Sequence, residues 1–363
     1  MTEEEYIYLF GRMTTIGPVN YDRMLALYGS AEAAWRCDNP MLNSQNQRRE
    51  WKLLHMPQEE AKLLMQKERM EAQEIRFLHR DAAEYPEAFS CLADPPIGVF
   101  VQGRLPQPYE DTVAIIGSRQ CTPYGRACAA HLAEELARRH IWVISGMALG
   151  IDACGQRAAL GQGGLSLAVL GSGIDVCYPT ENEQLFEQLK KKGGILSEYG
   201  PGEAGLAFHF PLRNRLISAL SKVIVVVEAR RKSGTLITVD QALEQGKNVL
   251  AVPGRIDDPM SVGCNDLLRQ GAGVCAHADD ILRELGWSES RIRGSESGEI
   301  EKQMLTLTFE EKQVLDLLMY DPIHIDRLAE STGRSIGDLM VVLWGLEQKK
   351  LCRQVSSHTY QRC

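Results

Sequence analysis

Four glycine-rich stretches follow short apolar segments of the chain and could bind an anion. They are residues 117–119, 145–152, 171–175 and 232–235. Glycine lets backbone amides approach a phosphate closely, and a following helix adds partial positive charge at its N-terminus. If the apolar segments are parallel strands, their carboxyl ends meet at one edge of a sheet. Glycines at strand ends can also serve tight turns alone, but four such stretches on one edge favour a phosphate site.

The segment 208–232 concentrates positive charge beside aromatic rings. Phe208, His209 and Phe210 precede its arginines. The segment holds six cations and one acid, Glu228, which gives it a net charge of +5 in a chain of net charge −8. Rings that stack on bases beside cations that hold phosphates are typical of single-stranded nucleic-acid sites. A solvated charged turn beside core aromatics is the alternative interpretation. The six cations are Arg213, Arg215, Lys222, Arg230, Arg231 and Lys232.

Familiar cofactor and metal motifs are incomplete, so no cofactor and no metal are expected. The stretch 171–176 has the first two glycines of a dinucleotide fingerprint but Val176 in place of the third. Lys232-Ser233 lacks the preceding glycines of a nucleotide-binding P-loop. None of the ten cysteines forms a C-x-x-C pair or a zinc-type spacing with histidine. We therefore expect free thiols.

Candidate catalytic groups are few. Asp152, Asp175 and Glu228 lie at predicted strand ends, but no serine–histidine–aspartate set and no pair of carboxylates can be assembled from them. Asp152 is expected to orient its own loop, and His209 to pack or stack among the neighbouring rings. The sequence thus predicts no catalytic residue. The rival hypothesis is a nucleotide-base hydrolase, or another nucleotide-binding enzyme on a related Rossmann-like scaffold, with Glu228 as its carboxylate.

The elements that must position these residues alternate between buried strands and amphipathic helices. The apolar segments lack strict alternation, as expected for strands covered on both faces, and residues 124–139 place alanines and leucines on one helical face. Residues 180–183 (TENE) resemble a capping box opening a helix to residue 189. Residues 80–285 are therefore predicted to form an α/β domain with a Rossmann-like, doubly wound, mostly parallel sheet. The predicted strands are 97–101, 113–116, 141–144, 165–170, 195–196, 223–227 and 249–252.

Different units flank this domain. Residues 1–75 read as a small helical domain of the helix-hairpin-helix or SAM-like kind, which could touch a phosphate or serve as a packing module. Residues 286–304 are rich in Ser, Gly and Glu and predict a linker. Residues 305–363 predict three helices, the third capped by Ser335, and a terminal strand pair, which together make a winged helix.

Composition narrows the class of protein. The 363 residues are 44% hydrophobic and 24% charged, as in ordinary globular chains. The apolar runs are far shorter than a membrane span, and the acidic N-terminus has no signal-peptide pattern, so a cytoplasmic protein without membrane contact is expected. The net charge of −8 argues against coating nucleic acid with the whole surface, but not against a local basic track.

A series of ordered motifs resembles the DNA-processing protein A family (DprA, also called Smf) over essentially the whole chain. The resemblance rests on residues 114–119 (AIIGSR), 145–152 (SGMALGID), 168–175 (AVLGSGID), Tyr178-Pro179, 210–215 (FPLRNR), 233–238 (SGTLIT) and 251–254 (AVPG). It implies a non-enzymatic, homodimeric protein that protects incoming single-stranded DNA and helps load the recombinase RecA onto it during natural transformation. The nucleic-acid-binding residues expected from the motifs and the basic segment are Gly117, Ser118, Arg119, Phe210, Arg213, Arg215, Lys232, Ser233, Gly234 and Thr235.

Three details qualify this expectation. Many members carry a lysine shortly before the aromatic–proline pair, whereas residues 203–209 hold none, and Arg230, Arg231 or Lys232 is expected to supply that charge. The apolar run 249–285 is expected to provide part of a two-fold interface. The predicted third helix of the winged helix, 335–346, contains no Lys or Arg, which favours protein contact over reading of duplex DNA.

Overall fold

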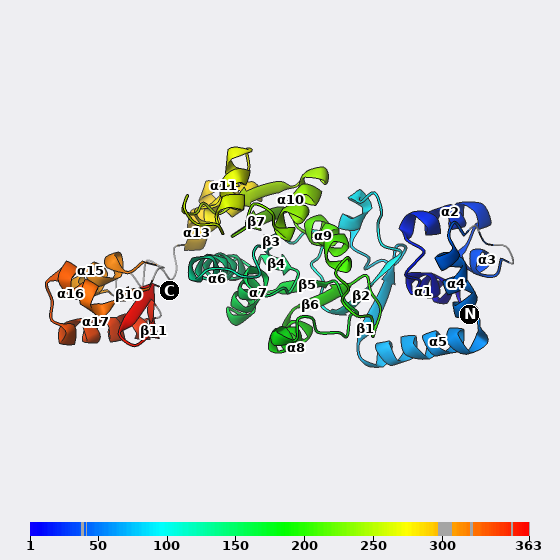
Figure 1. Cartoon of the computed structure of the whole chain (residues 1–363), viewed down its shortest axis with the longest axis horizontal. Coiled ribbons are helices and arrows are strands. Elements are labelled where there is room, and N and C mark those ends of the chain that lie inside the picture. Colours follow the sequence, from blue (N-terminus) through cyan, green and yellow to red (C-terminus); the bar gives the residue numbers. More distant parts are fainter. Residues whose placement is uncertain (38–39, 41, 297–306, 320–321, 350, 363) are drawn as a thin grey trace.

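The described part of residues 1–72 contains five helices, and the first four of them pack around a cluster of aromatic rings. The computed structural model (Figure 1) describes residues 1–37, 40, 42–296, 307–319, 322–349 and 351–362. Thr2 and Glu5 form a capping box at the first helix, and Pro18 begins the second, which ends at Gly29 with φ +87°. Phe10 lies between Tyr21, Trp35 and Trp51. The helices are α1 (Glu3–Gly11), α2 (Pro18–Tyr28), α3 (Ala31–Trp35), α4 (Gln45–Leu54) and α5 (Pro57–Ala72).

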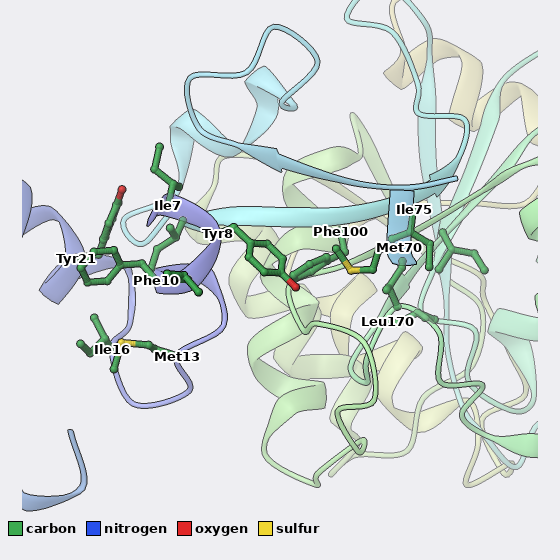
Figure 2. Packing of buried hydrophobic residues seen from close by; sticks show 14 of the residues in the cluster. Ile7, Tyr8, Phe10, Met13, Ile16, Tyr21, Met70, Ile75, Phe100 and Leu170 are labelled. Carbon is green, nitrogen blue, oxygen red and sulfur yellow. The ribbon is translucent and has the colours of Figure 1, made fainter. Parts of the chain in front are cut away.

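This helical unit packs directly on the central sheet. The ring of Tyr8 in α1 meets the ring of Phe77 edge-on, with 5.3 Å between their centroids. It also lies beside Phe100 (Figure 2). Arg12 forms an ion pair of 2.7 Å with Glu203, and both side chains are largely buried. These ring contacts and this ion pair hold the helical unit against the sheet.

The central sheet has nine strands in the order β1-β2-β6-β5-β4-β3-β7-β8-β9. The pairs β1–β2 and β2–β6 are antiparallel, and the other pairs are parallel; Val113 of β3, for example, lies opposite Val223 of β7. The chain builds outward from β3 in one direction through β4, β5 and β6 and in the other through β7, β8 and β9. The topological switch point therefore lies between β3 and β7. The strands are β1 (Ile75–His79), β2 (Gly98–Gly103), β3 (Thr112–Ile116), β4 (Trp142–Ser145), β5 (Ser166–Leu170), β6 (Gly194–Ser197), β7 (Val223–Val226), β8 (Asn248–Ala251) and β9 (Gly273–Val274).

Helices cover both faces of this sheet, as a doubly wound fold requires. Successive residues of β3 point to opposite faces: Val113 and Ile115 pack with α6 and α12, whereas Ala114 and Ile116 pack with α9 and α10. The expected Rossmann-like fold is confirmed in this respect. The helices are α6 (Pro123–Arg138), α7 (Ile151–Gly161), α8 (Glu183–Lys192), α9 (His209–Leu220), α10 (Gly234–Glu244), α11 (Val262–Arg269), α12 (Ala278–Glu284) and α13 (Glu289–Glu296), with 3-10 turns η1 (Glu87–Cys91) and η2 (Thr180–Asn182).

Two local predictions are wrong. Residues 180–183 are not a capping box, because Thr180–Asn182 form the 3-10 turn η2 and α8 begins at Glu183 without a side-chain cap. The start of the predicted linker is ordered structure: Glu289–Glu296 form α13, Ile292 is buried, and the indole of Trp287 donates a 2.9 Å hydrogen bond to Asp111. The rest of the predicted linker, from residue 297, lies outside the described residues.

The C-terminal unit has the expected winged-helix elements. The elements are α15 (Phe309–Leu317), β10 (Ile323–His324), α16 (Ile325–Thr332), α17 (Ile336–Gln348), β11 (Cys352–Ser356) and β12 (Thr359–Arg362), with sheet order β10-β12-β11. The core of this unit holds Val314 of α15, Leu328 of α16 and Leu343 of α17, and the Ser335 side chain caps α17 by accepting from the backbone of Asp338. Throughout the described part of the chain, every helix is too short or too polar to traverse a lipid bilayer.

Candidate nucleic-acid interface

A cavity of about 750 Å³ opens at the switch point, beyond the carboxyl ends of β3 and β7. We call it the switch-point cavity. This is the place where open parallel sheets bind ligands. The cavity gathers residues that are more than a hundred positions apart in the sequence. Of the nucleic-acid-binding residues expected from the sequence, those that line it are Gly117, Ser118, Arg119, Phe210, Arg213, Lys232, Ser233, Gly234 and Thr235.

The glycine loop after β3, residues 117–119, is held by hydrogen bonds with two other segments of the chain. The Ser118 amide donates a 2.8 Å hydrogen bond to the Glu228 carbonyl, and the Ile151 amide donates one of 3.2 Å to the Ser118 carbonyl. A Cβ on Gly117 would lie 2.7 Å from the side chain of Ile151, so any larger residue would push the loop away from α7. The loop presents Arg119 to solvent, and no carboxylate of the described residues forms an ion pair with it. Its charge is therefore available to an anion.

Phe210 forms the aromatic wall of the cavity. Its ring stacks on Tyr178 with 5.2 Å between centroids and 28° between planes, and the guanidinium of Arg119 lies 5.6 Å from its centroid. A Cβ on Gly171 would lie 2.7 Å from the ring, which explains the need for glycine there. Tyr178 is 46% exposed and Phe210 is partly exposed. An aromatic surface next to an exposed cation suits a base and its phosphate.

The start of α10 supplies a second place for a phosphate. The Ser233 side chain caps the helix by accepting from the Thr235 amide at 3.2 Å. Lys232 and Gly234 are exposed, and a Cβ on Gly234 would meet nothing within 4 Å, so the backbone is open to solvent here. The positive end of the α10 dipole and the Lys232 ammonium both favour an anion at this corner.

Arg213 lies beneath the cavity, and the expectation that it points outward to phosphates is wrong. It is only 4% exposed, and its guanidinium donates to the carbonyls of Val169 and Gly146, the latter at 3.1 Å. Burial lowers the pKa of Arg213 to about 10, an effect that the neighbouring Asp152 carboxylate opposes. Asp152 in turn accepts a 3.0 Å hydrogen bond from the Gly146 amide, and burial raises its pKa. The expected loop-orienting role of Asp152 agrees with this contact.

Arg215 does not line the cavity. Its guanidinium is held by Glu198 at 2.9 Å and by Asp94 at 3.1 Å, and the residue is 8% exposed. We therefore assign it a structural role in place of the nucleic-acid contact expected from the sequence. Lys222 likewise pairs with Asp111 at 2.8 Å. The net charge of +5 counted along segment 208–232 is thus not a single basic surface.

Two further groups that were considered for catalysis, His209 and Glu228, are held by neighbouring residues. His209 stacks on Tyr199 with 3.9 Å between centroids, and burial lowers its pKa, in agreement with a packed histidine. Glu228 is 1% exposed, does not line the cavity, and accepts hydrogen bonds from the amide and hydroxyl of Thr122. A Cβ on Gly125 would collide with this carboxylate. The carboxylate that the hydrolase hypothesis requires is therefore turned away from the cavity, towards the start of α6.

Several lining residues were not among those expected from the sequence. Tyr178, Gln120, Asn214 and Arg230 all line the cavity. Tyr178-Pro179 belongs to the motifs quoted above, but nothing in the sequence places its ring on Phe210. Arg230 was considered as a replacement for the missing lysine, and its position at the cavity is compatible with that role.

Comparisons with known proteins agree with this architecture. Residues 76–286 match the family model described as DNA recombination-mediator protein A, and residues 304–356 match that of the DprA winged helix domain. The chain is similar to DNA processing protein DprA of Streptococcus pneumoniae, with 40% identity over 55% of this chain and 71% of that protein. It is also similar to Protein Smf of Escherichia coli, with 35% identity over 74% of this chain and 72% of that protein.

Two solved structures resemble the chain. The X-ray structure of the Streptococcus pneumoniae protein aligns with a TM-score of 0.67 and 31% identity, over 78% of this chain and 98% of that one. A Helicobacter pylori DNA processing protein A, described for its single-stranded DNA binding mode, aligns with a TM-score of 0.52 and 31% identity, over 58% of this chain and 95% of that one.

Proposed function

The chain belongs to the DNA recombination-mediator protein A family, and from this premise we propose that it binds single-stranded DNA in the switch-point cavity. The observation that carries the proposal is that an exposed Arg119, the Phe210–Tyr178 ring pair and the start of α10 all line one cavity. Each of these groups favours a different part of a nucleotide strand.

The proposed division of labour follows from their chemistry. Arg119 and Lys232 bind backbone phosphates, and the amides around Ser233 and Gly234 add hydrogen bonds at the positive end of α10. Phe210 and Tyr178 stack on a base. Because stacking on such a ring requires a base that is not paired in a duplex, the site favours single strands and tolerates any sequence.

We further propose that the protein is a non-enzymatic, cytoplasmic mediator that protects the strand and delivers it to RecA. Support for the absence of catalysis comes from Glu228, whose carboxylate is bound to Thr122 and does not line the cavity. RecA loading during transformation rests on family membership. We also propose a homodimer, and its support is Ile256, 96% exposed, and Val274, 53% exposed, in the run 249–285.

The test is fluorescence anisotropy with labelled oligo-dT and with a duplex of the same length. We expect tighter binding of the single strand, weakened by salt because phosphates release counterions. In parallel, nucleoside monophosphates are incubated with the protein and free base is measured. Equal or tighter binding of the duplex would contradict the proposal, and release of base would restore the hydrolase hypothesis.

A further inference from the structure

Two cysteines lie directly behind the glycine loop of the switch-point cavity. Cys121 follows Gln120 at the end of the loop, and Cys154 is the fourth residue of α7, against which the loop packs. Both are free thiols, Cys121 buried and Cys154 partly exposed, and both pack in the same apolar cluster with α6 and the sheet. An accessible thiol beside a buried one is the arrangement of an oxidisable pair.

The surroundings favour a thiolate on Cys154. It lies in the first turns of α7, near the positive end of that helix, and Arg126 approaches the neighbouring Cys121 sulfur at 3.9 Å. The hydrogen bond from Cys121 lowers the pKa of Cys154 to about 7; burial opposes this effect, while Arg126 and Arg157 add to it. Cys128, on the adjacent helix α6, provides the contrast, because burial raises its pKa.

We propose that Cys154 and Cys121 form a peroxide-responsive thiol pair that closes to a disulfide and thereby weakens binding at the switch-point cavity; the second half of this proposal rests on the proposed function. The Cys154 thiolate attacks one oxygen of hydrogen peroxide, the O–O bond breaks, and the departing hydroxide takes up a proton to become water. The Cys121 sulfur then attacks the resulting sulfenic acid. The S–O bond breaks, the hydroxyl leaves as water with the proton of the Cys121 thiol, and both sulfurs are oxidised while one peroxide is reduced.

Closure of the pair must disturb the loop that carries Arg119. A disulfide brings the two sulfurs to about 2.05 Å, so Cys121 and α7 must approach each other. The loop has little space for this movement, since a Cβ on Gly150 would already lie 2.2 Å from the Ser118 carbonyl oxygen, and the Ser118 amide is bound to Glu228. Arg119 lies two residues before Cys121, so the shift displaces the cation that we assign to phosphate.

The experiment uses the reduced full chain, treated with hydrogen peroxide near neutral pH and digested for peptide mapping under non-reducing conditions. We expect a Cys121–Cys154 linkage that dithiothreitol reverses, with modification of Cys154 about tenfold faster than that of Cys128 because the thiolate is the reactive form. Cys128→Ser serves as the matched control and should still form the linkage. Cys154→Ser should not form the linkage. Because this variant keeps the buried Cys121, it still tests the pair if Cys121→Ser fails to fold.

Binding to oligo-dT is measured on the same samples. Oxidation should weaken the affinity of the wild type and of Cys128→Ser about five- to tenfold, with recovery on reduction, and leave Cys154→Ser unchanged. If no Cys121–Cys154 peptide is found, the proposal that these residues form a disulfide is wrong. If the linkage forms but the affinity for oligo-dT does not change, the proposed effect of the disulfide on the cavity is wrong. If the reduced protein does not bind oligo-dT, the proposed function and the coupling fail together, while the peptide map alone still decides whether the pair exists.

Discussion

Arg119 and Arg213 line the same cavity but should respond to mutation in opposite ways. Arg119 is exposed and has no acidic partner among the described residues, whereas Arg213 is buried, donates to two strand-end carbonyls and lies beside the buried Asp152. Replacing each with alanine therefore separates a ligand contact from a structural one.

The expected magnitudes follow from burial. Arg213→Ala removes the donor to two strand-end carbonyls and the positive charge that stabilises the buried Asp152 carboxylate, which should cost about 3–5 kcal/mol of unfolding free energy. For a domain of this size that lowers Tm by roughly 6–20 °C. Arg119→Ala should change the unfolding free energy by no more than about 0.5 kcal/mol. It should nevertheless weaken oligo-dT binding about tenfold, because one charge-assisted phosphate contact is lost.

Thermal denaturation and anisotropy at several salt concentrations measure both effects. The slope of log affinity against log salt should fall by about 0.7 in Arg119→Ala, the loss expected for one phosphate of a single strand. Arg269→Ala, which removes an exposed arginine outside the cavity lining, is the matched control and should change neither quantity appreciably. A stable Arg213→Ala protein, or an Arg119→Ala protein with unchanged affinity and slope, would refute these assignments.

Three further predictions concern the rings, the C-terminal unit and assembly. Phe210→Ala should weaken oligo-dT binding by about 1–3 kcal/mol, with an unchanged salt slope, because it removes stacking but no charge; an altered slope would contradict a stacking role. Deleting residues 297–363 should leave the single-strand affinity within about tenfold of that of the full chain. Deletion from residue 287 should also lower Tm, since Trp287 and Ile292 pack on the central core. Equal Tm values for the two truncations would count against that packing. Ile256→Arg should shift the protein from dimer to monomer in sedimentation at micromolar concentration. A wild type that is already monomeric would show that the proposed interface does not exist.

Much of the central fold could be predicted because buried parallel strands leave a clear mark in the sequence. Runs such as 223–227 are apolar at every position, since helices cover both faces of the sheet. The shared position of the glycine loops followed from the same reasoning, because parallel strands end at one edge. Two strands of the sheet were missed: β1 (Ile75–His79), which follows directly on the helical unit, and β9, which has only two residues.

The roles of individual arginines could not be predicted in the same way. Charge counted along the chain does not show on which side of a helix each residue lies, and α9 turns both Arg213 and Arg215 inwards, to different partners. The carboxylates that hold Arg215 come from residues 94 and 198, far away in the sequence. A polar composition likewise predicted a linker from residue 286, but Trp287 and Ile292 pack on the central core and residues Glu289–Glu296 form α13.

The central claim, that single-stranded DNA occupies the switch-point cavity, is tested most directly by photo-crosslinking. Oligo-dT carrying one 5-iodouracil base is bound to the full chain and irradiated, and the attached peptides are sequenced by mass spectrometry. A base stacked on the ring pair should crosslink to Phe210 or Tyr178, and unlabelled oligo-dT should compete for the reaction. Crosslinks confined to the helical unit of residues 1–72 or to the winged helix, with none at these two rings, would contradict the account.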